Sequence, residues 1–262
     1  MEAATAASET KTEGASVPEA PVAAEKPGKK VQGATLTVSG VNQYYGESHT
    51  LWDAGVIVPP GACVCLMGRN GVGKTTLLKV IMGLLPAASG KVRFAGAELP
   101  GGKADARARA GIGYVPQGRE IFPSLTVEEN LMVGRSALGK RAMPENVLAL
   151  FPVLKTMLGR RGGDLSGGQQ QQLAMGRALA LDPKLLILDE PTEGIQPNIV
   201  AEIGDVIARL CDEGVTVLFV EQKLAFARRV ARSFVILDRG RAVADGAIGE
   251  LTDDLVRRHL TV

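Results

Sequence analysis

The 262-residue sequence has few aromatic residues and no excess of charge of one sign. It contains one Trp, three Tyr and six Phe, and its 30 Lys and Arg residues nearly balance its 28 Asp and Glu residues. Proteins that bind nucleic acid without sequence preference use a basic surface and aromatic stacking platforms. We therefore expect no nucleic-acid partner.

Cysteine, histidine and long apolar runs are also scarce. Three Cys and two His provide neither a disulfide framework nor a four-ligand zinc set. Cys63 and Cys65 lie two positions apart in an apolar run, so on a strand they face the same way, and we expect both to be small buried side chains. No run of about 18 apolar residues is present. The start of the chain also lacks the pattern of a secretion signal, a positively charged region followed by an apolar one. We expect a reducing compartment, no membrane span and no secretion signal.

Glycine is abundant, with 32 residues, which indicates several places where the backbone turns tightly or approaches a ligand closely. Residues 1–33 are rich in Ala, Glu, Thr, Lys and Pro without an apolar period, which predicts a disordered tail. Residues 34–262 read as one α/β domain. The predicted elements are β-rich runs at 34–41, 56–58, 62–67 and 91–94, buried parallel strands at 185–188, 215–220 and 234–237, and an amphipathic helix at 197–213. Residues 119–164 lack such strands and look helical, so we interpret them as an insertion beside the sheet.

A glycine-rich segment follows the apolar run 62–67 and fits the pattern GxxxxGK[ST]. Its residues are Gly68, Arg69, Asn70, Gly71, Val72, Gly73, Lys74 and Thr75, followed by Thr76. Backbone N–H groups at the start of a helix form an anion cradle, which Lys74 extends toward the β- and γ-phosphates. The Thr75 hydroxyl is a candidate Mg²⁺ ligand. The pattern predicts a phosphate loop, and the alternative is a glycine-rich turn with an exposed lysine.

Two carboxylates end the buried strand predicted at 185–188. Ligands of open α/β sheets collect at the carboxyl ends of the strands. Asp189 suits a role in binding Mg²⁺, and Glu190 suits polarising the water that attacks a γ-phosphate. Taken alone, the pair could equally be solvated.

The segment Leu165-Ser166-Gly167-Gly168-Gln169 precedes a helical stretch, and Ser166 with Gln169 is sufficient for a capping box. Together with the phosphate loop and the carboxylate pair, however, this segment resembles the LSGGQ motif of the nucleotide-binding domain of ABC transporters. The resemblance covers about residues 35–250. It implies a P-loop NTPase of the ABC ATPase type, with a mostly parallel core sheet, an N-terminal antiparallel β subdomain and a helical subdomain at about 119–175.

The resemblance also implies the remaining site residues, with ATP and Mg²⁺ as cofactors. Residues 166–169 would bind the γ-phosphate of ATP held by the phosphate loop of a second ATP-binding subunit, identical or related. Tyr45, with Tyr44 as the neighbouring candidate, occupies the position of an aromatic residue that stacks on adenine. Gln117 matches a glutamine that contacts Mg²⁺ and the attacking water. The implied catalytic set is Glu190, Gln117, Gln222 and Lys74, and the implied metal set is Thr75, Gln117 and Asp189.

Two positions depart from the ABC pattern. Gln196 replaces an Asp in the loop after the carboxylate pair, which puts its dimer-contact role in doubt. Gln222 replaces a histidine that switches with the γ-phosphate. An amide can donate a hydrogen bond to a phosphate, but it does not become a cation near neutral pH. We therefore expect hydrolysis to depend mainly on Glu190 and to be slower or more dependent on a partner.

Gln222, the short helical insertion and residues 118–123 resemble importers of branched-chain amino acids and amides. Within that group, residues 42–46, 68–71, 161–164, 169–172 and 192–197 most resemble the shorter ATP-binding subunit of urea transporters. This resemblance implies a subunit that powers urea import from the cytoplasmic face of the membrane, with permease subunits as direct partners and a solute-binding protein as an indirect one. The alternatives are an importer of branched-chain amino acids or short amides, and a soluble ABC ATPase not engaged in transport.

Overall fold

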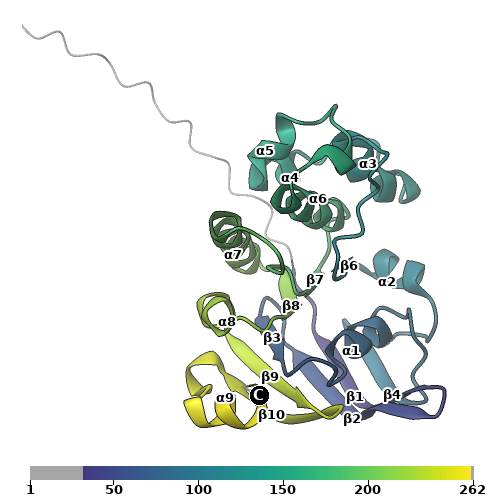
Figure 1. The fold of residues 1–262 in the computed structure, drawn as a ribbon. Coiled ribbons are helices and arrows are strands. Elements are labelled where there is room, and N and C mark those ends of the chain that lie inside the picture. Colours follow the sequence, from purple (N-terminus) through teal and green to yellow (C-terminus); the bar gives the residue numbers. More distant parts are fainter. Residues whose placement is uncertain (1–31, 261–262) are drawn as a thin grey trace, which may run out of the picture.

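The computed structural model describes residues 32–260. Nearly all of the predicted tail, residues 1–31, lies outside the described residues, as do residues 261 and 262. The described residues form two sheets and a group of helices, and the elements of these three parts alternate along the chain (Figure 1).

An antiparallel sheet in the order β2-β1-β4-β5 lies at one end of the domain. Its strands are β1 (Leu36–Tyr45), β2 (Ser48–Val58), β4 (Ser89–Phe94) and β5 (Ala97–Glu98). The sequence placed only short runs here, because the polar and aromatic residues of 42–52 hide the strand period. In the structure, Tyr45 pairs with Ser48 across a tight turn, which extends β1 and β2 toward each other.

The core sheet has the order β10-β9-β3-β8-β7-β6, with β10 antiparallel at one edge and the other strands parallel. Its strands are β3 (Cys63–Met67), β6 (Ile112–Val115), β7 (Leu185–Asp189), β8 (Thr216–Val220), β9 (Ser233–Asp238) and β10 (Arg241–Ala247). The expected α/β class with a mostly parallel core sheet and an N-terminal antiparallel sheet is confirmed.

Helices cover both faces of the core sheet. The helices around it are α1 (Lys74–Ile81), α2 (Ala104–Ala110), α6 (Gly167–Leu179), α7 (Pro197–Asp212), α8 (Leu224–Val230) and α9 (Asp253–His259), with a 3-10 turn η2 (Ile248–Glu250). Cys63 and Cys65 face the core with α6 and α7, as expected, and Val64 and Leu66 face the core that contains α1 and the antiparallel sheet. Each face of β3 is therefore buried in a different hydrophobic core.

Residues 119–164 form the loop and helices that stand beside the core sheet with α6 (Figure 1). The helical elements are α3 (Val127–Ala137), α4 (Glu145–Leu150), α5 (Pro152–Lys155) and η1 (Gly162–Asp164). Residues 119–126 precede α3 as turns and loop, so the helical interpretation was wrong for the start of this segment. Thr126 begins α3 with a capping box to Glu129, because its side chain and that of Glu129 satisfy each other's backbone N–H. No helix between residues 32 and 260 is long and apolar enough to cross a membrane.

Candidate nucleotide-binding and hydrolysis site

Four neighbouring parallel strands end at one edge of the core sheet, and each leads directly into a segment that the sequence marks as functional. β3 leads into the phosphate loop, β6 into Gln117, β7 into Asp189 and Glu190, and β8 into Gln222. Because parallel strands point the same way, their carboxyl ends place these distant residues together. A cavity of about 350 Å³ lies there. Its lining residues are Asn70, Gly71, Gly73, Lys74, Thr75, Thr76, Gln117, Glu190, Glu193 and Gln222.

The phosphate loop is held from outside by the turn between β9 and β10. Gly240 donates its N–H to the carbonyl of Val72 at 2.9 Å. Gly68 has a φ of +149°, and a Cβ at this position would lie 2.3 Å from the carbonyl oxygen of Leu237. Only glycine fits this close approach to β9.

Lys74 folds back onto the phosphate loop. Its ammonium donates to the carbonyls of Gly68 and Arg69, each at 2.7 Å, and its side chain is buried. Burial lowers the pKa of Lys74, while Glu190 and Asp189 act in the opposite direction. A cation held by neutral carbonyls in this way is ready to turn toward an anion that enters the loop.

Asp189 is a buried carboxylate without adequate partners. It is 1% exposed, and neither side-chain oxygen has a partner in hydrogen-bond geometry. Burial raises the pKa of Asp189, and the nearby Thr75 hydroxyl only partly opposes this shift. An orphaned carboxylate beside a threonine hydroxyl is a donor set of the kind that Mg²⁺ prefers. No group of three or more His, Cys, Asp or Glu within residues 32–260 is placed to bind a metal, so a cation here would draw its other ligands from phosphate and water.

Glu190 accepts hydrogen bonds from two amide side chains. Gln222 Nε2 donates to its Oε1 at 2.6 Å, and Gln117 Nε2 donates to its Oε2 at 3.3 Å. The backbone of Glu190 is in the left-handed region, with a φ of +50°, which for a residue with a Cβ stores strain. The carboxylate is thus held at the mouth of the phosphate cavity by groups that do not titrate near neutral pH.

Two further carboxylates support this arrangement, and neither belongs to a motif that is recognisable in the sequence. Glu193 accepts from Gln117 at 2.9 Å and lines the phosphate cavity. Glu221 is 3% exposed and accepts from the Thr192 hydroxyl at 2.7 Å and from the backbone N–H groups of Gln222 and Lys223. It thereby ties the loop after β8 to the loop after β7. The only signal for Glu221 in the sequence was its place directly after β8. That signal becomes specific only when the strand order is known, because β8 then lies between β3 and β7, which both lead into motifs.

The segment 166–169 starts α6 in a separate location. Ser166 and Gln169 form the expected capping box, with bonds of 3.4 and 3.0 Å. A second cavity, of about 410 Å³, lies at this helix start. Its lining residues are Val153, Ser166, Gly167, Gly168, Gln169, Gln172, Gly194, Gln196, Ile199 and Glu202. It shares none of these with the phosphate cavity, so the described part of one chain does not bring the two motifs together. Gln196 lies at this second cavity.

The two candidate adenine platforms differ in their surroundings. The Tyr44 ring stacks on His49 at a centroid distance of 4.0 Å, and His49 contacts Trp52 at 3.5 Å. Tyr45 is 48% exposed and has no ring partner among the described residues. Tyr45 therefore has the free face that stacking on a base requires.

The sequence and the fold match known proteins. The family model described as ABC transporter matches residues 51–193. The branched-chain amino acid transport ATP-binding protein BraG of Pseudomonas aeruginosa is 44% identical over 85% of this chain and 97% of that protein. The glutamate/aspartate import ATP-binding protein GltL of Escherichia coli K12 is 35% identical over 84% and 93%. The dimeric structure of MJ0796, a bacterial ABC transporter cassette, matches with a TM-score of 0.73 and 26% identity over 81% and 98%.

These observations define a P-loop ATPase of the cassette type. The chain belongs to the ABC transporter family, as an ATP-binding subunit that hydrolyses ATP to power transport.

Proposed function

We propose that this chain hydrolyses ATP at the phosphate cavity with Glu190 as the group that accepts the proton of the attacking water. The observation that carries the proposal is the convergence of Gln117 and Gln222 on Glu190, beside a lysine and a phosphate loop in one cavity. In this proposal Lys74 turns from the loop carbonyls to the β- and γ-phosphates. Gln222 orients the carboxylate, and the water attacks the γ-phosphorus as ADP leaves.

Mg²⁺ fits the donor set at this cavity, with Thr75, Asp189 and Gln117 as the proposed holders. When bound, it would neutralise charge that develops on the phosphate oxygens. The backbone N–H groups of the loop residues Gly68, Arg69, Asn70, Gly71, Val72, Gly73, Lys74, Thr75 and Thr76 are proposed to hold the phosphates. Tyr45 is proposed to stack on the adenine, because its ring face is free.

We further propose that two copies, or this chain and a related subunit, complete each other's sites. Within one chain the cavity at Ser166 shares no residue with the phosphate cavity. A helix N-terminus is a ready anion site, so α6 of one subunit can receive the γ-phosphate held by the other. The likeness to a cassette known as a dimer supports this arrangement.

The transporter partner is proposed to dock at a third cavity, of about 320 Å³, between the core sheet and the helices of residues 127–179. Arg119, Glu120, Asn130 and Val133 lie on its wall beside residues of α6. Residues 119–131 follow Gln117 directly, so a change at the nucleotide can reach this surface through a short segment. The proposed partners are membrane permease subunits, with a solute-binding protein as an indirect partner and the inner face of the cell membrane as the location.

For the transported solute, the relatives favour a branched-chain amino acid or a related amide. BraG is named for branched-chain amino acid transport, as is LivF of Archaeoglobus fulgidus, which is 36% identical over 81% of this chain. Urea is the second candidate, because residues 42–46, 161–164 and 192–197 resemble urea-transporter ATP-binding subunits most closely. The resemblance concerns the ATPase alone, and none of these residues contacts the solute.

Uptake of labelled leucine and labelled urea tests this proposal, in source cells that lack the chain and are complemented with the wild type or with Glu190→Gln. We expect cells without the chain to lose uptake of one of the two solutes, and only the wild type to restore that uptake. Loss of leucine uptake selects the amino acid importer, and loss of urea uptake selects the urea importer. If neither changes, both importer assignments are wrong.

A further inference from the structure

Three consecutive residues after Gln117 have left-handed backbones. Gly118, Arg119 and Glu120 have φ values of +82°, +70° and +46°. Residues with a Cβ adopt this region rarely, and two in succession require support from their surroundings. Here the support comes from α6, because Arg177 Nη1 donates to the carbonyl of Glu120 at 2.6 Å. The same Arg177 lies over the Phe122 ring at 4.4 Å.

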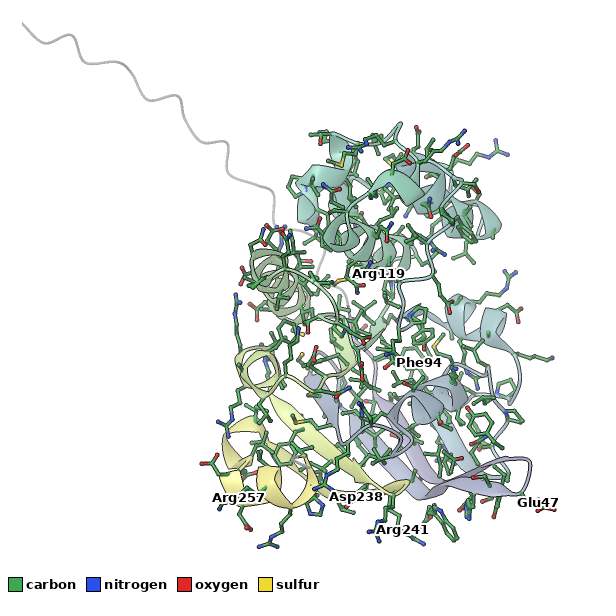
Figure 2. All side chains as sticks on the ribbon, in the orientation of Figure 1. Glu47, Phe94, Arg119, Asp238, Arg241 and Arg257 are labelled. Carbon is green, nitrogen blue, oxygen red and sulfur yellow. The ribbon has the colours of Figure 1, made fainter. Side chains whose placement is uncertain are left out.

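The effect of this turn is to place the Arg119 guanidinium at the start of α6. A Cβ at Gly167 would lie 3.0 and 3.2 Å from the two terminal nitrogens of Arg119, and a Cβ at Gly194 would lie 3.8 Å from one of them. Both glycines line the cavity at Ser166. Figure 2 shows Arg119 between the core sheet and the helices above it.

The charge of Arg119 is not balanced where it lies. Its guanidinium is half-buried, and its one partner within residues 32–260 is the neutral Oε1 of Gln170, at 3.3 Å. No carboxylate of those residues lies within ion-pair distance of it. The N-terminus of a helix carries a partial positive charge, so a cation beside it is unfavourable unless an anion joins them.

From this geometry we infer that Arg119 binds the γ-phosphate of ATP held by the phosphate loop of the second subunit. The inference rests on the composite site of the proposed function and adds a charged ligand to it. The γ-phosphate of ATP, which carries up to two negative charges, would compensate both the guanidinium and the start of α6. The guanidinium would donate to phosphate oxygens, while the same residue's backbone stays joined to Gln117 of its own subunit. ADP, which lacks the γ-phosphate, would gain nothing from Arg119.

The first test compares Arg119→Ala and Arg119→Lys with the wild type in the purified full chain. We expect Arg119→Ala to lower kcat by roughly tenfold or more, as loss of a charge-assisted contact to phosphate would, with ADP affinity unchanged. Arg119→Lys should recover part of the loss. Arg177→Ala is the comparison for the turn: it loosens the support of Arg119, so it should lower kcat by no more than Arg119→Ala does and add little in a chain that carries both substitutions. If Arg119→Ala leaves kcat unchanged, or weakens ADP binding as much as it lowers kcat, the inference is overturned.

The second test asks which subunit's nucleotide Arg119 serves. Mixed dimers are formed from Lys74→Ala chains, whose phosphate loop is impaired, and Arg119→Ala chains. If Arg119 acts on the partner's nucleotide, the mixture regains activity, because one site then combines an intact loop with an intact Arg119. In a mixture of the wild type with a chain that carries both substitutions, the mixed dimers should be inactive. The activity of that mixture should then not exceed the activity of the wild-type dimers in it. The opposite pattern means that Arg119 acts on its own subunit's nucleotide, which overturns the inference.

A reference mixture separates this inference from the composite site itself. Ser166→Asp keeps a good helix cap but places a negative charge where the partner's γ-phosphate would bind. Lys74→Ala mixed with Ser166→Asp should regain activity. If it does and the Arg119→Ala mixture does not, only the role of Arg119 is wrong. If the reference mixture regains nothing, the composite site fails and the inference fails with it.

Discussion

The side-chain amide of Gln222 donates a 2.6 Å hydrogen bond to Oε1 of Glu190, across the ends of two adjacent parallel strands. Gln117 holds the other carboxylate oxygen from the third strand. A histidine at position 222 could take up a proton and change its interaction with a phosphate, whereas the amide keeps one charge state near neutral pH. We therefore propose that Gln222 orients Glu190, and its loss should affect turnover more than binding.

Gln222→Ala should lower kcat by roughly tenfold, about 1.4 kcal/mol of barrier, with little change in the KM for ATP. The reason is that Glu190 keeps its charge but loses one of the two donors that fix its carboxylate. Steady-state ATP hydrolysis at saturating Mg²⁺ measures both constants.

Gln222→His is the matched comparison for this position. It should introduce a dependence of kcat on pH with an inflection near about 6.5, the ordinary range of histidine, that the wild type lacks. An unchanged kcat in Gln222→Ala would remove Gln222 from the catalytic set, whatever the result for the histidine variant.

Asp189→Asn should stabilise the nucleotide-free protein at pH 7. The same change should reduce the further stabilisation that MgATP gives. The carboxylate is 1% exposed and its oxygens have no partner in hydrogen-bond geometry, so its charge opposes folding. Removing that charge should raise the free energy of unfolding by about 1 kcal/mol. Thermal unfolding with and without MgATP measures both effects, and a nucleotide-free variant less stable than the wild type would contradict this account.

The difference in the free energy of unfolding between the wild type and Asp189→Asn should depend on pH with a defined sign. Burial raises the pKa of Asp189 in the folded state, so the folded protein binds this proton more tightly than the unfolded chain does. The wild type therefore loses stability relative to Asp189→Asn as the pH rises from the unfolded pKa, near about 3.9, through the raised folded value. Denaturant unfolding of both proteins across this range should show the gap growing with pH and then levelling off.

Most of the core fold could be predicted because its strands and helices carry strong local patterns. Residues 185–188 and 234–237 are continuous apolar runs, and residues 197–213 have a clear helical stripe ending before Gly214. The full lengths of β1 and β2 could not be predicted, since Tyr44, His49 and Trp52 form a stack that appears only when the two strands pair.

The candidate site was predictable where a motif fixes the backbone, as at 68–75, and less so where side chains meet across strands. Glu193 and Glu221 have no motif of their own, and their partners lie up to 76 positions away in the chain. The placement of the Arg119 charge at the start of α6 depends on a left-handed turn, which the backbone preferences of Arg119 and Glu120 do not favour. Contacts of this kind follow from strand order and backbone strain, which the sequence does not display.

Tyr45→Ala should weaken ATP binding more than Tyr44→Ala does. Tyr45 presents a free ring face, whereas Tyr44 is stacked on His49 at 4.0 Å. Loss of stacking on a base costs roughly 1–3 kcal/mol, which corresponds to about 5- to 150-fold in Kd. Titration with a fluorescent ATP analogue measures the affinities, and Tyr45→Phe, which keeps the ring, should bind like the wild type. Equal weakening by the two alanine variants would mean that Tyr45 is not the platform.

Gly68→Ala should destabilise the nucleotide-free protein more than Gly71→Ala does, although both glycines lie in the phosphate loop with positive φ. A Cβ at Gly71 meets nothing within 4 Å, so that change adds only backbone strain, roughly 1–2 kcal/mol. A Cβ at Gly68 would lie 2.3 Å from the carbonyl oxygen of Leu237, so the loop or β9 must move as well. We expect a further loss of roughly 1–3 kcal/mol for Gly68→Ala, measured by denaturant unfolding without nucleotide. Equal losses would mean that β9 yields to the added methyl group, and the phosphate loop would then not depend on the close packing of Gly68 against that strand.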